Sequence, residues 1–170
     1  MKATNIEIKA RSSKAKNDEI RSVLRVSGAF SHGIKHQVDT YFKTEKGLLK
    51  LRECNDKMSL IFYIREDSTG PKQSNFITYD ADRSESLKAV LAASYGVWKV
   101  IDKKREILSI DNVTFHLDEV VGLGTFMEIE ALDEDGSIGA EILTKQCNKY
   151  LSEFEIADND LLEGSYSDMI

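Results

Sequence analysis

Cysteine is scarce in this sequence, and its two residues carry no metal-binding or redox spacing. Cys54 and Cys147 lie far apart among 170 residues, and neither belongs to a CxxC pair. Zinc sites and disulfide frameworks use closely spaced or evenly paired cysteines. We therefore expect both residues to be reduced thiols.

Long apolar runs are also missing. No stretch of about 18 apolar residues occurs, which argues against a transmembrane helix. The first ten residues, "MKATNIEIKA", lack the apolar core of a signal peptide and read as part of the fold. We expect a cytoplasmic protein that does not bind membranes.

Basic charge is not in excess. Lys and Arg number 23 against 29 Asp and Glu, which gives a net charge of −6. General nucleic-acid binders usually carry a basic excess, so we expect no nucleic-acid partner. No low-complexity tract or linker divides the chain. Its length suits one well-packed domain, 1–170.

The pattern of apolar residues predicts more strands than helices. Helices are expected at 12–28, 84–96 and 139–150, with a short helical turn through Leu161 and Leu162 near the end of the chain. Strands are expected at 4–12, 36–43, 47–54, 58–66, 74–80, 97–108, 112–119 and 124–132. Short turns between consecutive strands indicate an antiparallel sheet. The fold class is therefore α+β, dominated by one sheet large enough to curl or close.

Several of these strands place charged residues on one face. In "NIEIKAR", residues 5–11, the alternation of an extended strand separates Glu7, Lys9 and Arg11 from Ile6 and Ile8. The same pattern recurs on at least five strands. The charged faces carry seven bases, Lys9, Arg11, Lys50, Arg52, Arg65, Lys103 and Arg105, and four acids, Glu7, Asp118, Glu128 and Glu130.

Two structures accommodate this pattern. In an open sheet the charges form a solvated outer face with cross-strand pairs. In a closed sheet they line a polar tunnel, where their positive surplus would attract an anion because unpaired buried charges are costly. A triphosphate with Mg²⁺ would suit such a tunnel. The spacing alone does not choose between the two.

A resemblance does choose. "NIEIKAR" is similar to the ExExK signature of the CYTH superfamily, and "LLKLRE", "VIDKKREIL", "FMEIEA" and "ADNDLLEGSYSDMI" continue the likeness in order. The superfamily includes class IV adenylyl cyclases, thiamine triphosphatases and inorganic triphosphatases. The resemblance implies a closed antiparallel barrel of about eight strands, flanked by helices, with the charged faces pointing inward.

The resemblance also implies roles for individual residues. The metal ligands for Mg²⁺ or Mn²⁺ would be Glu7, Asp118, Glu128 and Glu130. The triphosphate would be bound by Lys9, Arg11, Lys50, Arg52, Arg65, Lys72, Lys103 and Arg105, of which Lys9, Arg65 and Arg105 would be catalytic. Asn5 replaces the first Glu of the signature, and its amide oxygen could still coordinate a cation without adding negative charge.

Some residues near these motifs allow two interpretations. Gly70, Pro71 and Lys72 form a polar connection that is either a lid delivering Lys72 to the tunnel or a plain hairpin loop. Tyr41 either faces the tunnel or packs as a core aromatic. His116 reads as a structural or rim histidine, since one histidine is a poor metal-site signal. Gly122 and Gly124 suit a turn better than a phosphate loop, because no helix follows them.

The function implied by this likeness is Mg²⁺-dependent triphosphate processing. A class IV adenylyl cyclase-like enzyme would convert ATP to cyclic AMP and pyrophosphate. A triphosphatase would instead hydrolyse tripolyphosphate, thiamine triphosphate or a nucleoside triphosphate. A third hypothesis, which Asn5 makes reasonable, is a protein that binds phosphate ligands without catalysis. Family members often pair, so a homodimer is also expected.

Overall fold

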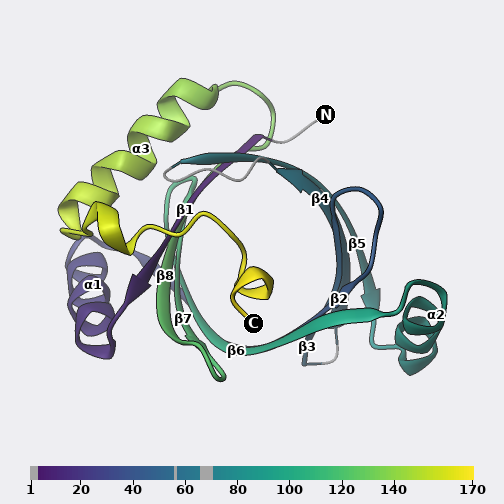
Figure 1. Cartoon of the computed structure of the whole chain (residues 1–170). Coiled ribbons are helices and arrows are strands. Elements are labelled where there is room, and N and C mark those ends of the chain that lie inside the picture. Colours follow the sequence, from purple (N-terminus) through teal and green to yellow (C-terminus); the bar gives the residue numbers. More distant parts are fainter. Residues whose placement is uncertain (1–3, 56, 66–70) are drawn as a thin grey trace.

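A computed structural model describes residues 4–55, 57–65 and 71–170. Within them, eight strands form one antiparallel sheet that closes into a barrel in the order β1-β5-β4-β3-β2-β6-β7-β8 (Figure 1). The strands are β1 (Thr4–Ser12), β2 (Phe30–Phe42), β3 (Leu48–Cys54), β4 (Lys57–Arg65), β5 (Lys72–Asp82), β6 (Val97–Ile110), β7 (Val113–Val120) and β8 (Gly124–Asp133). The expected β-dominated α+β class is confirmed.

The barrel closes at a short seam. On one side β1 pairs with β8 along its whole length, from Thr4 opposite Asp133 to Ser12 opposite Thr125. On its other side β1 pairs with β5 at only three positions, the last of which sets Glu7 opposite Lys72. The wall is therefore continuous but weakly joined between β1 and β5.

The predicted strand bounds agree with the structure to within two residues, except at the start of β2. This strand begins at Phe30 rather than at residue 36. Its first part pairs with β6, from Phe30 opposite Ser109 to Lys35 opposite Arg105. Phe30 and Ile34 remain 66% and 68% exposed, so this stretch has no buried face. The alternation used to recognise strands is absent there.

The helices lie on the outside of the barrel (Figure 1). They are α1 (Lys14–Val26), α2 (Glu85–Tyr95) and α3 (Ala140–Glu153). The Ser13 and Ser84 side chains accept hydrogen bonds from the backbone N–H groups of Lys16 and Leu87, which caps the first turns of α1 and α2. Among the described residues, no helix combines the length and hydrophobicity needed to cross a membrane.

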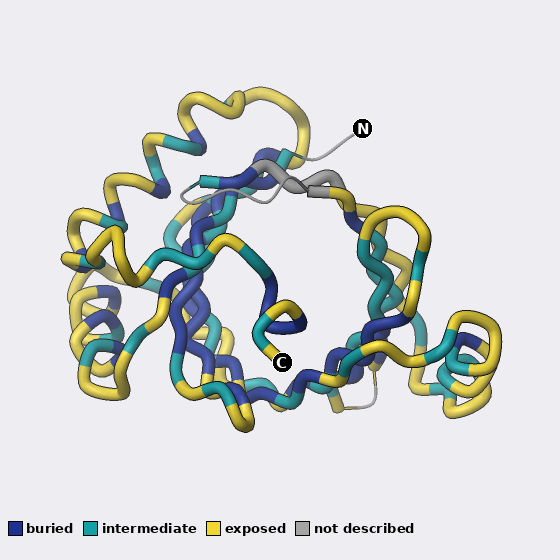
Figure 2. The backbone as a smooth tube through the Cα atoms, viewed as in Figure 1, coloured by how far each residue is buried: buried dark blue, intermediate teal, exposed yellow. Residues whose placement is uncertain are grey.

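The main hydrophobic core lies between the barrel wall and these helices. Ile8 of β1, Phe115 of β7 and Ile129 of β8 pack with Leu24 of α1 and Leu143 of α3, and all five are essentially inaccessible to solvent. A smaller core beneath α2 contains Phe42, Leu51, Met58 and Leu91. Figure 2 shows the buried positions following the wall on the side that α1 and α3 cover. The inner face of the strands is thereby left for polar residues.

The last residues of the chain enter the barrel. The helical turn expected through Leu161 and Leu162 is wrong, because Leu161 is extended and forms a β-bridge with Ala10. The 3-10 turns lie on either side, as η1 (Asp158–Asp160) and η2 (Tyr166–Met169). In Figure 1 the segment after η1 runs inward from β1, and η2 lies within the ring of strands. A bridge to β1 uses backbone groups, which explains why local side-chain spacing did not predict it.

Candidate functional site

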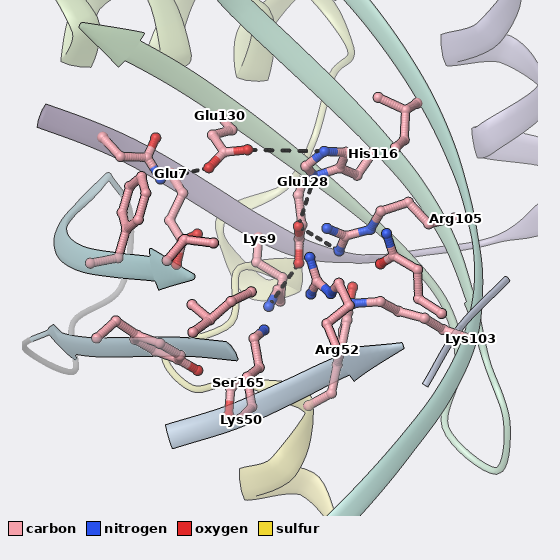
Figure 3. A pocket seen from close by; sticks show the side chains of 18 of the residues that line it. Glu7, Lys9, Lys50, Arg52, Lys103, Arg105, His116, Glu128, Glu130 and Ser165 are labelled. Atoms are coloured by element: carbon pink, nitrogen blue, oxygen red, sulfur yellow. Dashed lines mark hydrogen bonds and ion pairs between the residues drawn. The ribbon is translucent and has the colours of Figure 1, made fainter. Parts of the chain in front are cut away.

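The barrel encloses a polar cavity of about 310 Å³ (Figure 3). All eight described strands contribute to its lining, together with Ser165 and Tyr166 from the end of the chain. The charged faces of the strands therefore point inward, as the family resemblance implied, and the open-sheet alternative does not hold.

Most of the site residues predicted from the sequence meet at this cavity. Glu7, Lys9, Lys50, Arg52, Lys103, Arg105, Glu128 and Glu130 all line it. Asp118 lies behind the lining, fully buried, and contacts the cavity through its partner Arg105. Exposed Arg11 does not line the cavity; its guanidinium lies 5.7 Å from the centre of the Phe126 ring.

Two further predicted residues flank the connection between β4 and β5, Arg65 at the end of β4 and Lys72 at the start of β5. Lys72 is buried, and its ammonium donates hydrogen bonds to the carbonyl oxygens of Leu162, at 2.9 Å, and Glu163. The Arg65 side chain and Gly70 lie outside the described residues. The lid interpretation of this connection, which includes Gly70, stays a prediction.

Glu128 is the centre of one charge cluster. Its Oε1 lies 2.8 Å from Lys9 Nζ, while its Oε2 lies 2.7 Å from Arg105 Nη2 and 3.0 Å from His116 Nδ1. Arg105 also forms a two-pronged pair with Asp118, at 2.7 and 2.6 Å. Burial by itself would raise the pKa of Glu128, but Arg105 and Lys9 hold that pKa well below its ordinary value. Glu128 is therefore ionised and already satisfied by cations.

Asp39 is the centre of a second cluster, which the sequence analysis missed. Its carboxylate accepts two 2.7 Å hydrogen bonds from Arg52 and lies 3.1 Å from Lys50 Nζ and 3.6 Å from Lys103 Nζ. Burial opposes its ionisation, but Lys50, Arg52 and Lys103 lower the pKa of Asp39 well below its usual range. The strand pattern could have revealed Asp39, because it lies between Gln37 and Tyr41 at every second position and therefore on the same inward face of β2.

The positive surplus expected from the strand pattern is not found among the described side chains, because Arg11 lies outside the cavity, the Arg65 side chain is not described and Asp39 adds an acid. The lining cations are Lys9, Lys50, Arg52, Lys103 and Arg105. The carboxylates that line or directly support the cavity are Glu7, Asp39, Asp118, Glu128 and Glu130. Five charges of each sign are present. The cations are thus held in place by buried acids, and a highly charged anion would need additional positive charge to bind.

Lys103 is the cation whose charge is least secure. Its side chain is 2% exposed, and burial together with the neighbouring Arg105 lowers the pKa of Lys103 to about 7. Asp39 works in the opposite direction but does not compensate. The cavity therefore contains one ammonium group that gains or loses its charge near neutral pH.

Glu7 and Glu130 provide oxygen ligands suited to a divalent cation. They face each other across the β1–β8 pair, where like charges repel. Asn5 Nδ2 donates a 2.6 Å hydrogen bond to Glu130 Oε1, whereas the buried Asn5 Oδ1 has no hydrogen-bond partner among the described groups. Carboxylate and amide oxygens match the preference of Mg²⁺ and Mn²⁺.

These ligands do not form a closed metal cage. In the part of the chain that the structure describes, no three His, Cys, Asp or Glu side chains converge on one metal position. Asp118 and Glu128 both give their oxygens to other side chains. Mg²⁺ is commonly held by one or two carboxylates plus phosphate oxygens and water, and Glu7 with Glu130 fits that pattern.

His116 and Tyr41 also line the cavity, whereas Gly122 and Gly124 lie outside it. His116 lies 3.0 Å from Glu128 and 3.9 Å from Glu130, and so connects the two acids of β8. Tyr41 lines the cavity and is also a buried member of the hydrophobic cluster that contains Phe126, so both interpretations of this residue hold in part. Gly122 and Gly124 have positive φ values of 77° and 104° at the turn between β7 and β8, as expected for a turn.

The chain end contributes residues that no local pattern predicted. Tyr166 is buried, and its hydroxyl donates a 2.7 Å hydrogen bond to Asp118 Oδ2. Its ring lies 4.1 Å from Lys9 Nζ, measured to the ring centre. The motif containing Tyr166 was part of the family resemblance, but a short segment without periodicity gives no sign that it enters a barrel.

Comparison with known families agrees with this geometry. The model of the CYTH domain matches residues 3–166. The chain belongs to the CYTH domain family. The expectation drawn from "NIEIKAR" and its companion motifs is thereby confirmed. No curated protein matches the sequence significantly.

Solved structures share the CYTH fold of this chain. The PH1012 protein from Pyrococcus horikoshii OT3 has 23% identity and a TM-score of 0.82, covering 98% of this chain and 99% of that one. A candidate adenylate cyclase from Vibrio parahaemolyticus has 17% identity and a TM-score of 0.82, with 99% and 98% coverage. The candidate adenylyl cyclase HpAC1 from Hippeastrum, described with a dominant triphosphatase activity, has 17% identity and a TM-score of 0.64, with 97% and 93% coverage.

Proposed function

We propose that this CYTH protein is a Mg²⁺- or Mn²⁺-dependent enzyme acting on an organic triphosphate, of the class IV adenylyl cyclase type. The observation that carries the proposal is the meeting of five cations and the Glu7–Glu130 pair in one cavity. Because the acids that line or support the cavity already balance its described cations, a triphosphate would enter together with a divalent ion. Among candidate ligands, a metal-bound polyphosphate best suits this balance.

The protein side chains bind and orient the phosphate chain. Asp39 holds the fork of Arg52, and Asp118 holds the fork of Arg105, so both guanidinium groups are preorganised. Lys9 is fixed by Glu128 on the β1–β8 side of the cavity. Glu7 and Glu130 would hold the divalent ion, which when bound would neutralise charge on the phosphate oxygens.

One wall of the cavity favours an organic group over inorganic tripolyphosphate. β4 and β5 contribute Ile61, Tyr63, Phe76 and Thr78, none of which carries a charge. Apolar and aromatic surface of this kind would contact a base or another ring, whereas a bare phosphate chain gains little from it. ATP is therefore our preferred substrate.

Two chemistries fit this arrangement. A cyclase directs the ribose 3′-hydroxyl at the α-phosphorus and releases pyrophosphate, while a triphosphatase directs water at the γ-phosphorus. The triphosphatase is our second candidate, because HpAC1, which shares the fold, is described with that activity as dominant. A binding protein without catalysis is the third, since Asn5 removes one carboxylate from the signature.

A triphosphate panel separates these candidates. Purified protein would be incubated with ATP, GTP, thiamine triphosphate and tripolyphosphate in Mg²⁺ or Mn²⁺, with EDTA as the control. Cyclic AMP and pyrophosphate from ATP would identify a cyclase, and orthophosphate with the matching diphosphate but no cyclic nucleotide would identify a triphosphatase. Tight binding without turnover would favour the third candidate. Absence of both binding and turnover with every triphosphate would reject the proposal.

A further inference from the structure

The segment that follows η1 forms backbone contacts with β1 at Lys9 and Ala10. Leu161 bridges Ala10, and the Leu162 N–H donates to the Lys9 carbonyl oxygen at 2.9 Å. The buried Lys72 ammonium holds the Leu162 carbonyl from the β5 side. The chain end therefore crosses the β1–β5 seam at the level of the cavity, rather than lying loosely over the barrel.

A capped turn then fixes the direction of Tyr166. The Ser165 N–H and hydroxyl donate to Asp168 Oδ2 at 2.6 and 3.0 Å, and the Asp168 N–H donates to the Ser165 carbonyl at 3.1 Å. Ser165 and Tyr166 are 3% and 2% exposed. Reciprocal capping of this kind restricts the backbone of the turn, so Tyr166 is presented to the cavity in one orientation.

Tyr166 contacts members of both charge clusters, Lys9 and Asp118 beside Glu128 and Lys103 beside Asp39. Its hydroxyl donates to Asp118, the acid that holds the Arg105 fork. Its ring centre lies 4.1 Å from Lys9 Nζ and 5.2 Å from Lys103 Nζ. Phe126 supports the ring at 4.9 Å. Tyr166 thus contacts one proposed phosphate-binding cation, Lys9, directly and a second, Arg105, through Asp118.

The hydroxyl remains a donor throughout the neutral range. Burial and the nearby acids Glu128 and Asp118 raise the pKa of Tyr166 well above its ordinary value. Asp118 has no contact with solvent and accepts hydrogen bonds only from Arg105 and Tyr166 among the described side chains. Loss of the hydroxyl would therefore leave Arg105 as the only described side chain that donates to this buried carboxylate.

We propose that Tyr166 is a positioning residue of the site, whose hydroxyl locks the Asp118–Arg105 pair and whose ring seats the Lys9 ammonium. This inference rests on the proposed function, because it takes Lys9 and Arg105 as phosphate-binding groups. By this inference the end of the chain helps to position the phosphate-binding groups of the cavity, in addition to its structural contacts with the barrel.

The test compares Tyr166→Phe, which keeps the ring, with Tyr166→Leu, which removes it. ATP binding would be measured by calorimetry in Mg²⁺, with a methylene-bridged ATP analogue that resists cleavage, and melting temperatures would be recorded in parallel. We expect Tyr166→Phe to weaken ATP binding about tenfold, the lower end of the effect of one hydrogen bond to a charged group. Tyr166→Leu should weaken it about 20-fold, because the cation–π contact with Lys9 is lost too. The control is Tyr79→Phe, at a tyrosine that is 66% exposed.

The outcomes are distinguishable. If Tyr166→Phe bound ATP as tightly as the wild type, even with a lower melting temperature, Tyr166 would be structural only and the inference overturned. Should Tyr166→Leu fail to fold, the Phe variant still decides. A wild-type chain that binds ATP but turns over no triphosphate would reject the enzymatic function and leave the Tyr166 comparison valid. If the wild type bound no triphosphate, both proposals would fail.

Discussion

At the scale of single residues, Asp39 shows how strongly a buried acid can control a cationic site. It is 1% exposed and contacts Arg52, Lys50 and Lys103. Without it, three cations would remain close together in a poorly solvated wall. Buried charges that lose their partner are among the costliest changes in a protein.

We therefore predict that Asp39→Asn lowers the free energy of unfolding by about 3–5 kcal/mol. Urea denaturation would measure the loss. The matched control is Asp111→Asn, at an exposed turn position with φ 50°, a backbone conformation that Asn tolerates. Equal unfolding midpoints for Asp39→Asn and the wild type would contradict the structural role given to this carboxylate.

Lys103 leads to a pH prediction. Its pKa of about 7 lies below the ordinary lysine value, so the ammonium is charged below pH 7 and neutral above it. Triphosphate affinity should therefore fall as the pH rises through about 7. Replacing Lys103 with Met should remove this step from the affinity profile.

Calorimetric titrations of ATP between pH 6 and pH 8.5 would check this expectation. Lys104→Met is the control, since Lys104 is the exposed neighbour on the opposite face of β6. The control should keep the wild-type profile. A Lys103→Met profile that falls as steeply as the wild type would assign the titration to another group.

At the scale of elements, the strands were predicted better than their connections. Alternation in "NIEIKAR" and "LLKLRE" correctly separates lumen residues such as Lys9 and Arg52 from core residues such as Ile8 and Leu51. The start of β2 lacked that alternation because both its faces are exposed. The path of the chain end depends on backbone pairing with β1, which leaves no trace in side-chain spacing.

The candidate site followed the same division. For residues in alternating strands, such as Lys9 and Glu130, the sequence predicted both the strand and the face that points into the cavity. Closure itself required the family resemblance, since the charge pattern alone fits an open sheet as well. Asp39 was missed although the alternation of β2 predicts the face on which it lies. The position of Tyr166 in the cavity could not be predicted from the local sequence pattern.

The β1–β8 pair yields a prediction that belongs to both strands. Glu7 and Glu130 oppose each other, so Glu130→Gln should remove a repulsion and stabilise the metal-free protein by a few tenths of a kcal/mol. The same change should weaken the response of turnover to Mg²⁺. Glu130→Ala, which also loses the contact with Asn5, should abolish metal-dependent turnover.

Melting curves in EDTA and initial rates across a Mg²⁺ series would measure these effects. Glu119→Gln provides the control, because Glu119 is exposed on β7. It should leave the Mg²⁺ response unchanged. A Glu130→Ala variant with near wild-type turnover would remove Glu130 from the metal site.

At the scale of the whole molecule, the net charge of −6 contrasts with the cations collected in the lumen. A triphosphate approaches a protein of like sign and meets the lumen cations only once it is inside the cavity. Salt screens exposed charges over about 8–10 Å at physiological ionic strength. The balance between overall repulsion and local attraction should therefore depend on ionic strength.

We predict that Arg52→Ala weakens triphosphate binding, and that the loss is larger at low ionic strength, where an inward cation is least screened. Binding of ATP would be measured at about 20 and 200 mM salt. Arg83→Ala is the control, because Arg83 lies outside the cavity and pairs with Glu53. Equal losses at both salt concentrations would contradict an electrostatic role for Arg52.

The position of the hydrophobic core has a consequence for how such a protein can change. Ile8, Phe115 and Ile129 anchor the wall to α1 and α3 from outside, while their sequence neighbours face the cavity. Every second residue of a strand thus packs in the hydrophobic core, and the residues between them line the cavity. Evolution can exchange substrates by altering one set in charge-matched steps and leaving the other untouched, so different activities can arise on one durable framework.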